Sequence, residues 1–356
     1  MTPSAAQLGG RLCICVGAGG VGKTTVAAAI ACSRAAQGQR VAVVTIDPAP
    51  RLAQALGFDE LSSEPQRVAN AGELWAMRLD PKRTLDELIA SLAPDEAARD
   101  RALSNRIYRE LSGAVAGAQE FSAVAKLYQL DREGGFDAIV LDTPPSRNAL
   151  DFLEAPARLT RFFDGRALRV LLAQRGIAAR AASRAGAPLL GVLGRLTGVS
   201  VLREITAFFA AIGGMIDGLA ARAAAVQELL HDPATTFVLV SSPKREAIEE
   251  AIAFGAELRR AELSLAALVV NRIHTAPDAA ADPLALEELL GRRLAALVCE
   301  SADELTALAA ADGLGLARLR EAFPDLEPLL VPELGGQIED LDALARVAGY
   351  LGRERL

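Results

Sequence analysis

Gly17-Ala-Gly-Gly-Val-Gly-Lys-Thr-Thr25 stands near the start of the chain. This stretch fits the phosphate-binding loop pattern G-x-x-x-x-G-K-[ST], with Gly17, Gly22, Lys23 and Thr24 at the fixed positions. The glycines let successive backbone N–H groups turn toward an anion. The lysine can reach the β- and γ-phosphates of a nucleotide, and the threonine hydroxyl can ligate Mg²⁺. The stretch therefore predicts a nucleotide-phosphate site.

The flanking residues favour this interpretation over an ordinary glycine turn. Residues 11–16 form a buried-strand candidate, and residues 24–37 form an alanine-rich helix candidate that ends at Gly38. Strand, loop and helix in this order point a helix N-terminus at phosphate. A dinucleotide-binding oxidoreductase is an alternative, because Gly17-x-Gly19-x-x-Gly22 also matches its fingerprint. That fingerprint does not require the Lys-Thr pair that follows.

The composition limits the class of protein. The chain has 356 residues, 51% of them hydrophobic, and a net charge of −7. Its mean hydropathy is +0.24 and its pI is about 5.2. An acidic balance argues against a general nucleic-acid surface, which needs clustered positive charge. No uncharged apolar run is long enough to span a bilayer, and residues 1–10 lack the pattern of a signal peptide. We therefore expect a cytoplasmic protein.

Strand and helix candidates alternate along most of the chain. Further strands are expected at 40–45, 73–79, 136–141, 236–240, 265–270 and 329–331. This alternation predicts an α/β fold with a mostly parallel sheet and helices on both faces. We assign residues 1–154 and 231–356 to a nucleotide-binding domain and residues 155–230, which hold no convincing strand, to a helical insertion.

The insertion carries an apolar stripe that ends at Leu219. Its members recur at helical spacing: Leu202, Ile205, Phe208, Phe209, Ile212, Met215, Ile216 and Leu219. The simpler interpretation is that the stripe packs on the protein's own core. The alternative is a surface that holds an apolar client or a partner subunit.

Two aspartates follow strands, as a nucleotide hydrolase requires. Asp142 ends a strand candidate and can hold the Mg²⁺ shell, usually through water. Asp47 ends the second strand candidate and could orient or deprotonate the attacking water. Either residue alone could be a helix cap or a turn residue. Together with the phosphate loop they favour hydrolysis of a nucleotide.

The loop, Thr45-Ile46-Asp47-Pro48-Ala49 and Asp142-Thr143-Pro144-Pro145-Ser146 together resemble the ArsA family, which includes arsenite-efflux ATPases and guided-entry ATPases for tail-anchored membrane proteins. The likeness runs from Arg11 to about Leu351. It implies an ATPase of the dimeric type, with Lys23 and Asp47 in catalysis and ATP and Mg²⁺ as cofactors. The implied nucleotide contacts are Gly19, Gly20, Val21, Gly22, Lys23, Thr24, Thr25, Asn271, Pro332, Glu333 and Leu334. The implied metal site is Thr24, Asp47 and Asp142.

Three departures limit what the resemblance carries over. Ala18 stands where the family usually has a lysine that reaches the partner's nucleotide, so this charge is lost. Pro50 stands where switch I usually has a histidine. No CxxC motif is present, so no structural zinc is expected. The four cysteines, Cys13, Cys15, Cys32 and Cys299, form no evident cluster for arsenite, which makes arsenite efflux the weaker interpretation.

The expected partners also follow from the resemblance. It implies a homodimer, or a heterodimer with an ArsA-type paralogue, and the acidic net charge leads us to expect no nucleic acid partner. It leaves room for an apolar protein client, such as a tail-anchored protein, and for a transient link to a membrane. A second interpretation of Ala18 is that the chain is a poorly hydrolysing regulatory subunit that pairs with a catalytic paralogue.

Overall fold

The computed structural model describes residues 8, 10–109, 118–143, 208, 211–277, 282–336, 338 and 340–352, with no side-chain description at 118–120. The chain divides into two compact units. The first consists of Met1–Arg78, Gly134–Ala149 and Pro233–Leu356, and the second of Leu79–Glu133 and Leu150–Asp232. The predicted phosphate loop, both aspartates and the predicted base-binding residues all belong to the first unit.

The first unit is built on one eight-stranded sheet with the order β3-β4-β2-β5-β1-β6-β7-β8. Every neighbouring pair is parallel except β3 and β4. The strands are β1 Leu12–Gly17, β2 Val41–Thr45, β3 Gln66–Arg67, β4 Leu74–Arg78, β5 Ala138–Asp142, β6 Thr235–Ser241, β7 Leu265–Ile273 and β8 Leu329–Pro332. The predicted mostly parallel α/β fold is confirmed.

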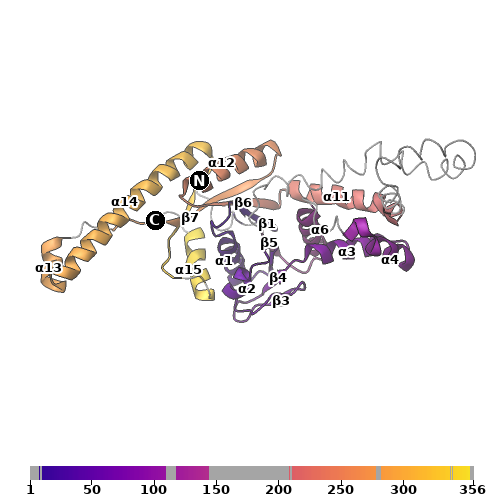
Figure 1. Cartoon of the computed structure of the whole chain (residues 1–356), viewed down its shortest axis with the longest axis horizontal. Coiled ribbons are helices and arrows are strands. Elements are labelled where there is room, and N and C mark those ends of the chain that lie inside the picture. The colour runs from indigo at the N-terminus through magenta and orange to yellow at the C-terminus, as the bar shows by residue number, and fades with distance from the viewer. Residues whose placement is uncertain are drawn as a thin grey trace, which may run out of the picture. The chain divides into compact units, whose positions relative to one another are not determined.

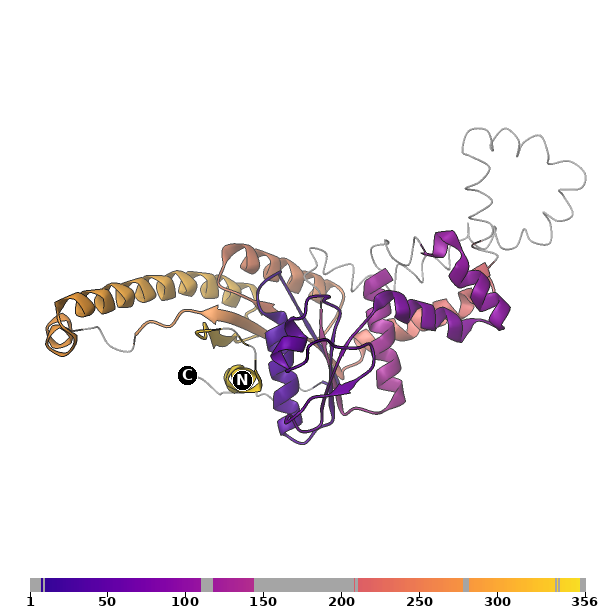
Figure 2. The same ribbon diagram turned by 60° about the horizontal axis from the view of Figure 1, so that its bottom comes forward.

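Helices cover this sheet, and Figure 1 shows α12 and α15 on opposite sides of its central strands. The helices of the first unit are α1 Lys23–Ala36, α2 Arg51–Ala55, α12 Arg245–Arg260, α13 Pro283–Leu290, α14 Arg292–Ala322 and α15 Leu341–Leu351. Helix α1 follows β1 directly and packs against α15 and β5. Figure 2 shows α14 running out beyond the sheet edge, with α13 at its far end.

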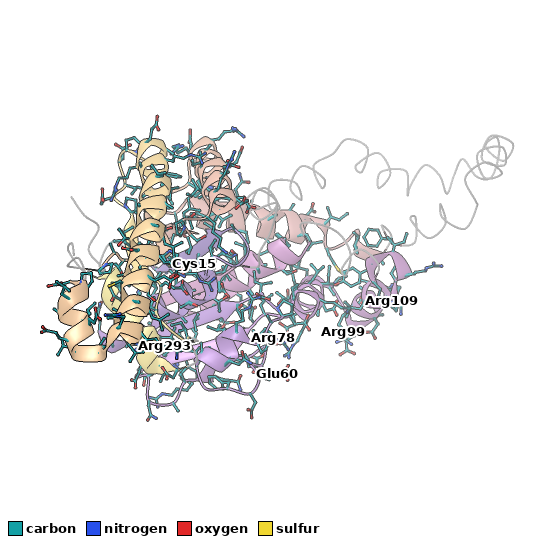
Figure 3. All side chains as sticks on the ribbon, turned by 60° about the vertical axis from the view of Figure 1, so that its left-hand side comes forward. Cys15, Glu60, Arg78, Arg99, Arg109 and Arg293 are labelled. Atoms are coloured by element: carbon teal, nitrogen blue, oxygen red, sulfur yellow. The ribbon has the colours of Figure 1, made fainter. Side chains whose placement is uncertain are left out.

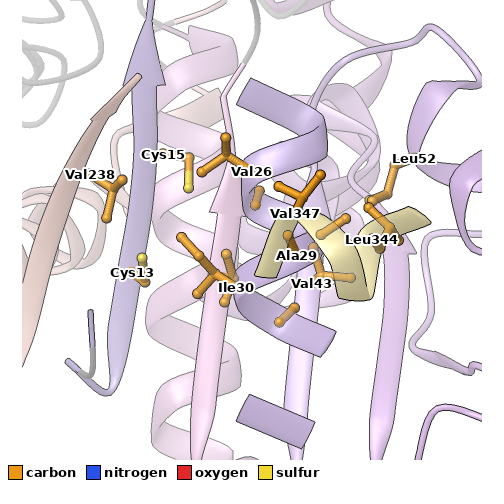
Figure 4. Packing of buried hydrophobic residues seen from close by; sticks show 14 of the residues in the cluster. Cys13, Cys15, Val26, Ala29, Ile30, Val43, Leu52, Val238, Leu344 and Val347 are labelled. Carbon is orange, nitrogen blue, oxygen red and sulfur yellow. The ribbon is translucent and has the colours of Figure 1, made fainter. Parts of the chain in front are cut away.

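A single apolar cluster joins α1 and α15 to the sheet (Figure 4). Cys13 and Cys15 point from β1 into this cluster and are fully buried. They pack beside Val26 and Ile30 of α1 as small apolar side chains. This packing fixes the start of α1 over the end of β1, which is where the phosphate loop lies.

The described part of the second unit is helical: α3 Pro81–Leu92, α4 Glu96–Ser104, α6 Ala118–Glu133 and α11 Ile216–His231. The contact division places residues 79–133 in this unit, whereas the sequence assigned only 155–230 to an insertion. Most of 155–230 lies outside the described residues, so the insertion and its boundaries stay a prediction.

The described members of the apolar stripe are buried. Phe208, Ile212, Met215, Ile216 and Leu219 are each less than a tenth exposed. Leu202, Ile205 and Phe209 lie outside the described residues. For the described members the packing interpretation holds, and they do not form an exposed client surface. Across the described residues, no helix is both long enough and apolar enough to cross a membrane.

Candidate nucleotide site

The loop between β1 and α1 requires glycine at two positions. Gly17 has φ +146°, and a Cβ there would lie 2.0 Å from the carbonyl oxygen of Val240. Gly22 has φ +92°, and a Cβ there would lie 2.2 Å from Nδ2 of Asn271. Any L side chain would therefore be strained at both positions and would collide with its neighbours. The loop keeps this narrow path so that its N–H groups can face an anion.

Lys23 lies at the first position of α1 and is 6% exposed. Its Nζ donates to the carbonyl oxygens of Gly17 at 3.0 Å and Ala18 at 2.9 Å. Burial lowers the pKa of the ammonium, while the nearby carboxylates of Asp142 and Asp47 act to raise it. The ammonium therefore sits inside the loop on neutral acceptors, which a phosphate oxygen can replace with a stronger, charge-assisted partner.

Asp142 ends β5, between β1 and β2, and so lies beneath the loop. Its Oδ2 accepts hydrogen bonds from Thr24 Oγ1 at 2.8 Å and Thr45 Oγ1 at 2.9 Å. Its Oδ1 is buried and has no hydrogen-bond partner among the described residues. Burial raises the pKa of this carboxyl to about 6, although the two threonine hydrogen bonds and Lys23 act to lower it.

These groups fit Mg²⁺. Mg²⁺ takes oxygen ligands and keeps several waters, so a threonine hydroxyl beside a carboxylate with a free oxygen is a suitable donor set. The unpartnered Oδ1 of Asp142 is costly while buried and uncompensated. A hydrated cation would compensate it. Thr24 and Asp142 are thus the residues of this chain that would hold the ion and its waters.

Asp47 follows β2 by two residues and lies on the wall of the same pocket. Its backbone N–H donates to Thr45 Oγ1 at 3.1 Å, and its Oδ1 accepts from the N–H of Ala49 at 2.9 Å. Its Oδ2 is 3.8 Å from Nη1 of Arg51, one turn along in α2. One oxygen is thus fixed by the backbone, and the other faces a cation.

The pocket has a volume of about 480 Å³, which is large enough for a nucleotide. Ten of the predicted site residues line it: Gly20, Gly22, Lys23, Thr24, Thr25, Asp47, Asn271, Pro332, Glu333 and Leu334. Gly19 and Val21 belong to the loop without lining the pocket, and Asp142 lies below Thr24. Residues as far apart in the sequence as Gly20 and Leu334 therefore meet at the carboxyl ends of the strands, where ligands bind in such sheets.

The predicted base-binding residues form the far wall. Asn271, on β7, donates from Nδ2 to the carbonyl oxygen of Val21 at 2.9 Å. The N–H of Glu333 donates to the carbonyl oxygen of Ile273 at 2.9 Å, which holds the segment after β8 against β7. Apolar side chains of Ile338 and Val347 complete this wall. An amide beside an apolar surface suits a flat, polar-edged base.

Four polar lining residues were not picked out from the sequence: Arg51, Gln54, Thr143 and Arg272. Arg51 could have been found, because it lies one helical turn after Asp47. Arg272 has φ +63° and follows Asn271, a position that sequence spacing does not mark. Thr143 Oγ1 donates to the carbonyl oxygen of Cys15 at 2.7 Å and so ties the end of β5 to β1.

Comparison with known proteins agrees with this geometry. Residues 11–289 match the family model described as anion-transporting ATPase. The chain belongs to this family. It is 25% identical over 261 residues to the ATPase GET3 of Podospora anserina, covering 72% of this chain and 71% of that one. It is 28% identical to the ATPase ARSA2 of Chlamydomonas reinhardtii, covering 72% and 66%. It is 23% identical to the ATPase get3 of Schizosaccharomyces pombe, covering 92% and 87%.

The family membership and the pocket together identify the protein as an ATPase of the ArsA type. The pocket holds the phosphate loop, a carboxylate beneath it and a second carboxylate on its wall. The predicted family, fold class and enzymatic activity are confirmed. The roles of the individual site residues stay predictions.

Proposed function

We propose that this protein is a Mg²⁺-dependent switch ATPase that works as a dimer. The observation that carries the proposal is the hydrogen-bonded set formed by Thr24 with the buried Thr45 and Asp142 beneath the phosphate loop. It couples the loop, the end of β2 and the end of β5 through one carboxylate oxygen. Loss of the γ-phosphate would alter the hydrogen bonds at both strand ends. Nucleotide switches reorder their loops through contacts of this kind.

The roles follow from the positions in the pocket. Lys23 binds the β- and γ-phosphates, and the loop N–H groups bind the remaining phosphate oxygens. Thr24 and Asp142 hold Mg²⁺, which neutralises phosphate charge when it is bound. Asp47 accepts a hydrogen bond from the attacking water and orients it. Asn271 and the Pro332–Leu334 segment hold the base.

Arg51 supplies the positive charge that Ala18 lacks. Three cationic side chains line the pocket: Lys23, Arg51 and Arg272. Arg272 faces Glu333 at 3.8 Å, on the base side. The Arg51 side chain is 63% exposed and lies beside Asp47, so it is free to turn toward a γ-phosphate. A guanidinium there would stabilise charge that develops during hydrolysis.

Phosphate release from ATP by the purified chain tests the proposal. We expect Mg²⁺-dependent hydrolysis that Lys23→Ala and Asp47→Asn abolish or reduce at least a hundredfold. Asp59→Asn is the matched control, because Asp59 is exposed and does not line the pocket. Equal rates in the Asp47→Asn and Asp59→Asn variants would overturn the role of Asp47.

The family resemblance favours an apolar protein client, such as a tail-anchored membrane protein, released by hydrolysis. ATP-dependent crosslinking of a transmembrane-helix peptide to the full chain would support this, and its absence would count against it. The alternative, a regulatory subunit that depends on a paralogue, predicts negligible hydrolysis by the chain alone. Brisk hydrolysis by the purified chain would exclude that alternative.

A further inference from the structure

The phosphate loop is anchored at its start by a buried strand. Cys15 of β1 (labelled in Figure 3) is fully buried, two residues before Gly17. The middle of the loop is open, because Gly19 and Gly20 are exposed and a Cβ at Gly20 would meet no atom within 4 Å. The loop therefore needs a second anchor between Gly20 and the start of α1.

Asn271 of β7 supplies this second anchor. Its Nδ2 donates to the carbonyl oxygen of Val21 at 2.9 Å, and both residues are buried. Gly22 comes so close to the same amide that a Cβ there would lie 2.2 Å from Nδ2. The peptide that joins Val21 to Gly22 is planar and trans. Fixing its carbonyl oxygen therefore also fixes the N–H of Gly22, which points in the opposite direction.

The amide of Asn271 is itself held in one orientation. Its Oδ1 accepts from the backbone N–H of Arg272 at 3.0 Å. Arg272 has φ +63°, and β7 shifts its register against β8 between Asn271 and Ile273. Such a bulge re-aims a side chain, and a non-glycine residue keeps a left-handed backbone only where its surroundings hold it. The Val21 carbonyl can only accept and the Arg272 N–H can only donate, so a reversed amide would lose both bonds.

The same amide can still bind a base. An asparagine amide has two N–H donors and an oxygen with two lone pairs. The carbonyl of Val21 takes one donor, and the N–H of Arg272 takes one lone pair. One donor and one acceptor remain, which complement the N6 and N7 edge of adenine. One side chain can therefore contact the base and brace the phosphate loop at the same time.

We propose that Asn271 is a positioning residue for the phosphate loop, in addition to its contact with the base. This rests on the proposed function, which places the base beside Asn271 and the phosphates in the loop. Asn271 holds the peptide between Val21 and Gly22 so that its N–H faces the phosphates before a nucleotide binds. A loop that is preorganised in this way loses less entropy on binding. Removal of the brace should thus weaken phosphate binding even when no base is present.

Inorganic tripolyphosphate separates the two roles of Asn271, because it carries three linked phosphates and no base. Isothermal titration calorimetry with Mg²⁺ present gives its dissociation constant, and that of a non-hydrolysable ATP analogue, for the full chain. We expect tripolyphosphate to bind Asn271→Ala roughly fivefold more weakly than the wild type, the contribution of one neutral hydrogen bond. The ATP analogue should lose more affinity than tripolyphosphate, because the variant also lacks the contact with the base.

Amide hydrogen exchange of residues 17–25 in the nucleotide-free protein is the second measurement. Exchange should be faster in Asn271→Ala, and this result decides the question even where tripolyphosphate binds too weakly to measure. Asn271→Ser should behave in the same way, because its side chain is polar but too short to reach Val21. Ile338→Ala is the matched control, because Ile338 lines the base wall of the same pocket with an apolar side chain. It should weaken only the ATP analogue.

Two results would overturn the proposal. Wild-type tripolyphosphate affinity and loop exchange in Asn271→Ala, with weaker binding of the ATP analogue, would restrict Asn271 to the base. Equal losses of tripolyphosphate affinity in Asn271→Ala and Ile338→Ala would point to a general disturbance of the pocket. Failure of the proposed function would look different. The wild type would then bind tripolyphosphate through a braced loop but release no phosphate from ATP.

Discussion

The buried carboxyl of Asp142 makes the stability of the metal-free protein depend on pH in a specific way. Its pKa is about 6 in the folded chain against 3.8 for an unperturbed aspartate, and burial is the main cause. A group with a raised folded pKa adds stability below its unfolded pKa and loses it as pH rises through its folded pKa. The free energy of unfolding should therefore fall as pH rises from about 4 to about 6, and no further above that.

The size of the fall follows from the two pKa values. A difference of about two units corresponds to roughly 3 kcal/mol over the whole window. Between about pH 5 and about pH 7.5 the expected loss is about 1.4 kcal/mol, because the unfolded chain is already mostly ionised at the lower pH. Asp142→Asn removes the ionisable group, and the cost of burying its amide does not depend on pH. The difference in unfolding free energy between wild type and variant should therefore change by about 1.4 kcal/mol between these two pH values.

Trp75 provides the assay. It is the chain's one tryptophan and lies on β4, in the unit that holds the site. Its ring packs edge-on to Phe136 at 6.3 Å and under the guanidinium of Arg40 at 5.4 Å, so its emission should change when this unit unfolds. Urea unfolding of the wild type and of Asp142→Asn, with a metal chelator present and at about pH 5 and about pH 7.5, gives the difference in unfolding free energy. A difference independent of pH would refute the burial of an ionisable carboxyl beneath the loop. Adding Mg²⁺ and ADP should reduce the pH dependence, because the ionised carboxylate then gains a cation.

Three further predictions concern the pocket. Gly22→Ala should weaken ATP binding at least tenfold in a fluorescent-nucleotide titration, because its Cβ would collide with the amide of Asn271. Gly20→Ala is the control: it has φ +77° but no atom within 4 Å of its Cβ, so it should suffer only backbone strain of roughly 1–2 kcal/mol. Equal losses of ATP affinity in the two variants would contradict the close approach at Gly22. Arg51→Ala should lower kcat roughly tenfold or more with little change in nucleotide affinity, and an unchanged kcat would remove Arg51 from the reaction. Ala18→Lys should raise kcat by adding a second cation to that of Arg51, and an unchanged or lower rate would show that positive charge at this position does not limit hydrolysis.

Much of the fold could be predicted because the relevant signals are local. Expected strand 73–79 is β4 at Leu74–Arg78, and the expected helix 24–37 is α1 at Lys23–Ala36. Short apolar runs rich in β-branched residues predict strands, and an alanine-rich run predicts a helix, without reference to the rest of the chain. The two-residue strand β3 was not predicted, because Gln66 and Arg67 have no strand pattern and form a strand only by pairing with β4. The grouping of residues 79–133 with the second unit also depends on tertiary packing that sequence pattern does not encode.

The candidate site, like the fold, contains residues that could be predicted from the sequence and residues that could not. The loop and the strand-end aspartates were predictable, because phosphate and Mg²⁺ chemistry demand particular residue types at short spacing. Arg272 was missed, because a surface arginine cannot be told from any other until the fold places it in a pocket, whereas the position of Arg51 one helical turn after Asp47 was a signal that the sequence did carry.

Asp312 connects the nucleotide pocket to α14. It is a buried residue of this helix, and its Oδ2 accepts from the backbone N–H of His274 at 2.8 Å and lies 2.9 Å from that residue's Nδ1. His274 follows β7 directly, three positions after Asn271, which lines the pocket. A buried carboxylate that loses its partner costs free energy, so α14 is held to the end of β7 at this point. Movement of β7 on nucleotide binding would therefore act on α14 through the Asp312–His274 contact.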